Sequence, residues 1–236
     1  MIDKSFIEKI ISLAPATPLE IEGRQYVSGA VAPVKDPVPE KLCIHTLTGL
    51  VDYYDQMTEA DQSYALFHVR DHENVALVSS LFGDFEQRKV YVSATAFELQ
   101  HRFNRHMPAE EFIIYLQSMF VQDETTAKIM RIVGNLTQGT EMNVSDDGVT
   151  QRVTARAGVA RVEVVDLPNP VTLRPFRTFM DIAQPASLFV LRIKADKDNG
   201  PICALYEADG GSWKNDAIAT IKTYLEDRKL GGKIIA

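Results

Sequence analysis

The chain has 236 residues, of which 45% are hydrophobic and 24% are charged, and its formal net charge is -7. These values are typical of a globular protein with a substantial core, and they exclude an extensively disordered chain. The acidic balance disfavours a protein that coats nucleic acid through bulk charge. No apolar run approaches the roughly 20 residues of a membrane-spanning helix, so we expect no membrane partner.

The first 40 residues differ in character from the rest of the chain. Three prolines within residues 32–39 predict an irregular connector, and Glu22-Gly23-Arg24 predicts the turn of a short hairpin. Apolar side chains recur at helical spacing over residues 3–13 and predict an amphipathic helix: Phe6, Ile7, Ile10, Ile11 and Leu13. We therefore expect residues 1–40 to precede a main domain of residues 41–236, with Phe6 and Ile10 contacting a second subunit.

The middle of the chain alternates between strand and helix signals. Leu42, Leu47, Leu50, Val51 and Tyr54 predict a helix of about four turns. Strands are expected over 62–70, 74–80 and 88–96, followed by a pair of helices, one opening at Pro108 and one covering 124–133. Three further strands are expected over 141–145, 149–156 and 159–165.

The stretch 173–225 predicts a β-hairpin feeding a final helix. Its apolar runs cover 188–193 and 202–206, and Ser212 is the expected N-cap of the helix. The sum is an α+β fold, mainly antiparallel sheet with an inserted helical pair and a C-terminal helix. Cys43 and Cys203 have no paired spacing, and the charged N-terminus does not resemble a signal peptide. We expect reduced, buried thiols in a cytoplasmic protein.

One cluster has the residue types of a metal site. His68, Asp71 and His72 lie within five positions, and imidazoles with a carboxylate bind divalent cations. On a strand, however, His68 and His72 lie ~13 Å apart, and no third ligand is anchored by spacing. A metal-dependent hydrolase is therefore one alternative, and a solvated polar turn is the other.

A second cluster has the residue types that contact nucleic acid. Its members surround one aromatic ring with imidazoles and guanidinium groups: His101, Arg102, Phe103, Arg105 and His106. Arginines bind phosphates, and an aromatic ring can stack on a base. The alternative is that Phe103 belongs to the core and that the charges form a solvated loop.

Charged residues near the C-terminal hairpin suggest a structural junction. Arg174 and Arg177 lie close to Asp181, and an arginine held between an aromatic ring and a carboxylate often fixes an inter-element or subunit contact. Glu207 and Asp209 lie at a strand end beside Trp213 and could form a small binding site. Turn geometry explains those two carboxylates equally well.

Three short motifs carry a resemblance to a known family. Leu173-Arg-Pro-Phe-Arg-Thr-Phe179, Gln184-Pro185 and Glu207-Ala-Asp-Gly-Gly-Ser-Trp-Lys214 resemble the YfdQ-like phage and prophage proteins of unknown function, mainly over residues 90–225. The resemblance implies a bacteriophage or prophage origin and expression in the host cytoplasm. It brings no catalytic residues.

No catalytic motif and no cofactor-binding pattern is evident in the sequence. We therefore expect a non-enzymatic phage accessory protein that acts as a homo-oligomeric assembly or binds a phage or host macromolecule. The first alternative is a nucleic-acid-associated accessory factor that uses the segment 101–106. The second is the metal-dependent hydrolase centred on His68 and His72.

Overall fold

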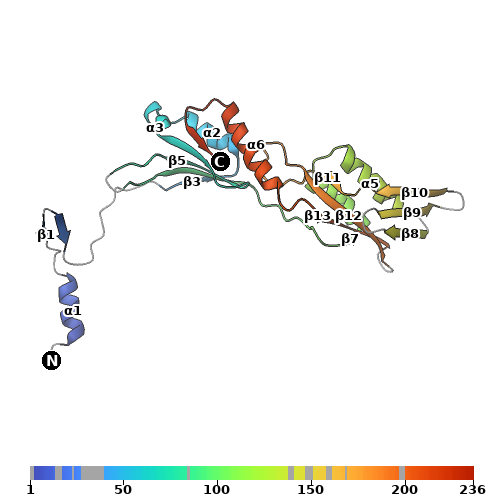
Figure 1. Ribbon diagram of the computed structural model, residues 1–236, viewed down its shortest axis with the longest axis horizontal. Helices are drawn as coiled ribbons and strands as arrows, with labels where there is room; N and C mark the ends of the chain where they lie inside the picture. The colour runs from blue at the N-terminus through green and yellow to red at the C-terminus, as the bar shows by residue number, and fades with distance from the viewer. Residues whose placement is uncertain are drawn as a thin grey trace. The chain divides into compact units, whose positions relative to one another are not determined.

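A computed structural model of the chain describes residues 3–13, 18–22, 24–27, 40–83, 86–137, 141–146, 151–157, 161–167, 169–196 and 200–236 (Figure 1). The predicted connector at 32–39 lies outside these residues. The fold is α+β with mainly antiparallel sheets, which confirms the predicted class. Two compact units are distinguished, Met1–Val38 and Pro39–Ala236.

The first unit contains the predicted helix and hairpin. Helix α1 covers Lys4–Leu13, and strands β1 (Pro18–Ile21) and β2 (Arg24–Val27) pair in antiparallel fashion. Glu22 has a φ of 53°, which places it in the left-handed region used by tight turns.

The second unit contains two hydrophobic cores. The first, which we name the α2/α6 core, lies between a five-stranded sheet and the helices α2 (Leu47–Asp55) and α6 (Trp213–Asp227). The sheet has the order β14-β4-β5-β6-β3. Its strands are β3 (Leu42–Ile44), β4 (Ala65–Val69), β5 (Asn74–Ser79), β6 (Val90–Thr95) and β14 (Lys233–Ile235), with the short helix α3 (Glu59–Ser63) before β4.

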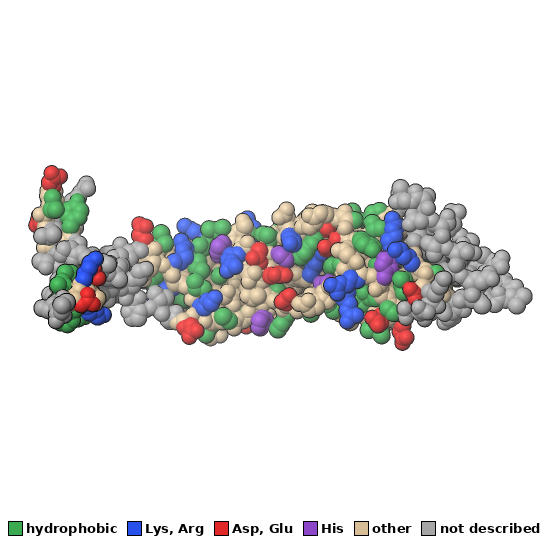
Figure 2. Space-filling model, turned by 90° about the horizontal axis from the view of Figure 1, so that it is seen from below, with side chains coloured by type: hydrophobic (Ala, Val, Ile, Leu, Met, Phe, Trp, Pro, Cys, Tyr) green, Lys and Arg blue, Asp and Glu red, His purple; other side chains and the backbone are tan. Residues whose placement is uncertain are grey.

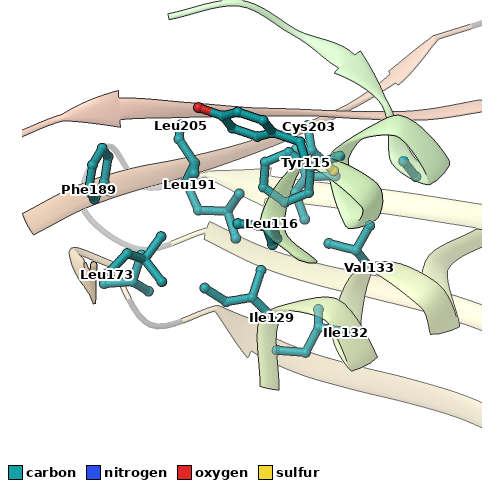
Figure 3. Close-up of a cluster of buried hydrophobic side chains, with 14 of the residues drawn as sticks. Tyr115, Leu116, Ile129, Ile132, Val133, Leu173, Phe189, Leu191, Cys203 and Leu205 are labelled. Atoms are coloured by element: carbon teal, nitrogen blue, oxygen red, sulfur yellow. The ribbon is translucent and has the colours of Figure 1, made fainter. Parts of the chain in front are cut away.

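The second core, the α4/α5 core, lies between the inserted helical pair and a four-stranded antiparallel sheet (Figure 3). The helices are α4 (Ala109–Met119) and α5 (Glu124–Thr137), and the sheet has the order β11-β12-β13-β7. Its strands are β7 (Met107–Pro108), β11 (Val171–Leu173), β12 (Ser187–Asp196) and β13 (Gly200–Glu207). A further sheet has the order β10-β9-β8, built from β8 (Glu141–Asp146), β9 (Gln151–Ala157) and β10 (Arg161–Leu167).

The structure corrects the predicted start of helix α2. Leu42 belongs to strand β3, and the helix begins at Leu47. The hydroxyl of Thr46 accepts a hydrogen bond from the Gly49 amide at 3.2 Å and so caps the first turn. The apolar residues from Leu42 to Tyr54, whose spacing predicts a single helix, therefore belong to two elements, β3 and α2.

Two other local predictions, for Gln62 and Cys43, are also wrong, and the prediction for Ser212 is confirmed in part. Gln62 belongs to helix α3, since β4 begins only at Ala65. Ser212 is the N-cap residue of α6 as predicted, but its side chain makes no capping hydrogen bond. Cys43 is exposed on the edge strand β3, whereas Cys203 is buried as expected.

Both edge strands of the five-stranded sheet run parallel to their neighbours, which a mainly antiparallel sheet does not lead one to expect. Strand β3 pairs with β6, and β14 pairs with β4. Gly232 permits the approach of the C-terminal strand, because a Cβ atom there would lie 3.1 Å from the Phe67 ring and 3.3 Å from the Ala65 carbonyl oxygen. Strand β14 is not among the elements that the sequence pattern predicts.

Candidate functional site

Residues 174–186 connect β11 to β12 and contact both cores, and we name them the junction segment. Phe179 and Ile182 are buried in the α2/α6 core. At the other end of the segment, the Phe176 amide donates a hydrogen bond to the Met119 carbonyl at 2.9 Å, at the end of α4. The segment therefore ties the two cores together.

Polar groups of the junction segment also hold the α2/α6 half. The carboxylate of Asp181 accepts hydrogen bonds from the Leu47 and Thr48 amides and from the Thr48 hydroxyl, at 3.1, 3.0 and 2.6 Å. Burial alone would raise the pKa of Asp181, but these hydrogen bonds hold it below its ordinary value. Asp181 thus satisfies amides in the first turn of α2, where a negative charge also complements the helix dipole.

Arg177 forms the centre of the junction. Its guanidinium carbon lies 3.6 Å from the ring centroid of Trp213, and one terminal nitrogen donates to Glu207 at 2.5 Å. The other terminal nitrogen donates to the Ser187 hydroxyl, which in turn donates to Asp209 at 2.5 Å. A buried guanidinium with two carboxylates in its network is a compensated charge.

His101 closes a second chain of hydrogen bonds beside Arg177. Its Nε2 atom lies 2.9 Å from the Phe176 carbonyl oxygen, which can only accept, so Nε2 carries the proton. Nδ1 therefore accepts from the Tyr115 hydroxyl at 3.0 Å. Burial lowers the pKa of His101 and raises that of Tyr115 to about 12. Both groups are neutral near pH 7, and their hydrogen bonds link α4 to the junction segment.

A cavity of about 350 Å³ opens beside these two networks, and we name it the junction pocket. Five rings line it: His72, Phe97, His101, Phe103 and Trp213. Its charged lining residues are Glu73, Glu98, Glu207, Arg177 and Lys214. Ligand pockets in proteins are typically lined by aromatic side chains together with a few charged or polar groups, and the junction pocket has such a lining.

The three residues of the predicted metal site, His68, Asp71 and His72, make different contacts. His68 is exposed on β4, while the Asp71 carboxylate accepts hydrogen bonds from the Glu73 and Asn74 amides, each at 2.8 Å. His72 packs edge-on against Trp213, with the ring centroids 4.7 Å apart. Within the part of the chain that the structure describes, no group of three or more His, Cys, Asp or Glu residues could hold a metal ion.

The predicted nucleic-acid residues do not form one surface. Phe103 stacks on His101 and packs against Phe189 in the α4/α5 core. Arg102 and Arg105 are exposed, and Arg102 lies 3.5 Å from Glu111. Basic and acidic side chains are interspersed on the face shown in Figure 2.

His106, the last residue of that cluster, is half-buried. It packs against Tyr206 with the ring centroids 6.3 Å apart. Its ring therefore packs partly within the chain.

The predicted interface residues divide into two kinds. Phe6 and Ile10 are 56% and 54% exposed on α1. Arg174 lies 3.8 Å from Asp123 at the surface, and Arg177 is buried within its own chain. The expected aromatic and carboxylate partners of Arg177 exist, but the carboxylate is Glu207 and not Asp181.

No motif in the sequence indicates that Ser187, Tyr115 and Phe97 belong to this site. Each belongs to an element whose local pattern shows only its place in a strand, a helix or a loop. Glu207 and Asp209 lie close to Trp213 in the sequence, around the start of α6, and the Arg177 network joins all three.

Comparison with known proteins found no matching family model, no matching curated protein and no matching solved structure. Among the described residues, no helix is long and apolar enough to cross a membrane.

Proposed function

We propose that this protein is a non-enzymatic accessory protein of a bacteriophage or prophage, which self-assembles in the host cytoplasm through helix α1. The observation that carries the proposal is the apolar face of α1. Its five large apolar side chains are all between 48% and 72% exposed. Such a contiguous apolar face typically marks an interaction site.

The geometry of α1 suggests the kind of contact. At about 100° per residue, the five apolar positions span about 160° of the helix circumference, wider than the seam of a two-stranded coiled coil. A ten-residue helix is marginal in isolation, and burying each large apolar side chain contributes about 1.5–3 kcal/mol. A partner that covers the whole face would therefore stabilise the helix itself.

A second copy of the chain is the occupant that we propose for this face. The polar side carries Lys4 and Lys9 against Glu8, and the Lys4–Glu8 pair is 3.6 Å apart. This is far from the run of basic residues with which an amphipathic helix holds an anionic lipid surface. Every copy supplies the same apolar face, so symmetric packing of several α1 helices would bury all of them.

Two further observations support the non-enzymatic and phage parts of the proposal. The groups with the best acid-base chemistry, His101 and Tyr115, already satisfy each other and the backbone. The three motifs that resemble the YfdQ-like proteins include the junction residues Arg177, Glu207 and Trp213.

The test is the mass of the full chain in solution, by size-exclusion chromatography with light scattering. The double variant Phe6→Ala, Ile10→Ala should lower the mass to that of a smaller species, because it removes the centre of the apolar face. The control is Lys4→Ala, Glu8→Ala, which changes the polar side and should leave the mass unchanged. An unchanged mass for the Phe6 and Ile10 variant would contradict the proposal.

A further inference from the structure

The junction pocket is the strongest feature of the second unit that self-assembly does not use. We propose that it binds a cationic group on a short aliphatic stem, such as the guanidinium or ammonium end of a basic side chain. The proposal rests on the shape of the cavity, its exposed aromatic ring and the charges around it. It is independent of α1 and its apolar face.

The cavity has the size and lining for such a group. A volume of about 350 Å³ lies at the lower end of small-molecule pockets, which suits one side chain better than a large cofactor. Phe97 lines this cavity and is 56% exposed. Its ring stacks on His45 at 4.5 Å between centroids, so one face is supported from within the chain. A supported, exposed ring can hold a cation over its free face.

The charges favour a cation over an anion. Arg177 and Glu207 neutralise each other at 2.5 Å, which leaves Glu73 and Glu98 against Lys214. Glu98 accepts one hydrogen bond from Gln100 at 2.9 Å, and Glu73 lies 3.4 Å from the His72 ring. Each carboxylate can accept further hydrogen bonds, since an ionised carboxylate has about four acceptor positions.

His72 does not cancel the charge of Glu73. Burial lowers the pKa of His72, and its ring lies edge-on against Trp213. The ring is therefore neutral near pH 7. The charged lining residues that remain are then two carboxylates, Glu73 and Glu98, and one exposed lysine, Lys214.

The protein already uses this recognition chemistry once inside the same pocket. Arg177 lies over the Trp213 ring at 3.6 Å and donates to a carboxylate. An incoming cation over Phe97 with Glu73 and Glu98 would repeat the combination of an aromatic face and a carboxylate.

The single tryptophan of the chain provides the readout. Trp213 lines the pocket, so its fluorescence should respond when a ligand enters. The probe is N-acetyl-arginine amide, titrated into the full-length protein at constant ionic strength, with N-acetyl-glutamine amide and N-acetyl-glutamate amide as neutral and anionic counterparts. We expect a saturable change for the arginine probe alone, with a dissociation constant on the order of 1 mM.

Variants locate the site. Glu98→Gln and Glu73→Gln should each weaken the arginine probe about tenfold, because each removes a charge-assisted hydrogen bond. Phe97→Leu should weaken it about threefold, and Lys214→Gln should strengthen it by removing a like charge. The matched control is Glu111→Gln, an exposed carboxylate that does not line the pocket and should change nothing.

Spermidine, titrated in parallel, distinguishes a free polyamine from a peptide side chain as the source of the cation. Tighter binding of spermidine would assign the site to polyamines, and tighter binding of the arginine probe would assign it to a basic peptide. The proposal is overturned if neither cation gives a saturable signal, if the neutral or anionic probe binds as well, or if Glu98→Gln and Glu111→Gln behave alike.

Discussion

Helix α1 and the junction segment are both short and rich in large apolar side chains, yet they differ in what covers them. In the junction segment, Phe179 is 1% exposed and Ile182 is 9% exposed. On α1, Ile11 and Leu13 are 68% and 72% exposed. The α2/α6 core covers Phe179 and Ile182, whereas the described part of the chain leaves the apolar face of α1 exposed.

The largest effect should come from Phe179, which anchors the junction segment in the α2/α6 core. Phe179→Ala removes a fully buried ring and should lower the free energy of unfolding by about 3–5 kcal/mol. Phe97→Ala is the matched control, because that ring is 56% exposed, and its cost should stay below about 1 kcal/mol. Urea unfolding followed by circular dichroism measures both, and equal costs would contradict the assigned role of the segment.

Next in size is the loss of the Arg177 network. Arg177→Ala leaves Glu207 and Asp209 without their cation and removes the stacking on Trp213, which should cost about 3 kcal/mol. Arg177→Lys should recover only part of this, since an ammonium cannot reproduce the planar fork. Arg174→Ala, at a surface pair 3.8 Å long, should cost less than about 1 kcal/mol. The same urea experiment would refute the network if Arg174 and Arg177 proved equivalent.

A smaller effect is expected from pH. Burial lowers the pKa of His101 and of His72 below the ordinary 6.5, so the unfolded chain binds more protons than the folded chain just below that value. The free energy of unfolding should therefore decrease as the pH falls from about 7.5 to about 5. Asp181 has a lowered pKa, so its stabilising contribution is present above the ordinary value of 3.8 and is lost mainly as the pH falls below that value.

Substitution of His101 separates this dependence from other causes. His101→Gln should reduce the decrease between about pH 7.5 and about pH 5 without removing it, because one titrating ring is gone while that of His72 remains. His68→Gln, on an exposed strand position, is the control and should retain the slope of the parent protein. A parent protein that gains stability toward low pH would refute the neutral state assigned to the two rings.

The smallest expected effect is a difference in the reactivity of the two cysteine thiols, Cys43 and Cys203. Cys43 is exposed, while burial raises the pKa of Cys203 to about 12. A thiol reagent should label one cysteine per folded chain, at Cys43, and two per chain in denaturant. Rapid labelling of Cys203 without denaturant would show that the α4/α5 core opens.

Local patterns in the sequence predicted most of the elements and little of their assembly. The helical pair, the 187–207 hairpin and the α1 stripe follow from periodicity and turn residues, which act over a few positions. Helix α2 illustrates the limit. Its start is fixed partly by Asp181, which lies 134 positions from Leu47 in the sequence.

In the candidate site, too, the sequence predicts contacts between residues that are close along the chain but not those that depend on packing. Glu207, Asp209 and Trp213 are close in sequence, so their proximity could be expected. The hydrogen bonds that Tyr115 donates to His101 and that Arg177 donates to Ser187 depend on how α4 and β12 pack against the junction segment. No period or spacing in one sequence encodes that packing.

The measurement that tests the central claim most directly is the mass of the unmodified protein by light scattering across a range of concentrations. The account predicts a discrete species at a whole-number multiple of the 26.4 kDa chain, at least two copies, that dissociates when Phe6 and Ile10 are replaced by alanine. A single species of 26.4 kDa at every concentration up to about 100 μM would contradict self-assembly through α1.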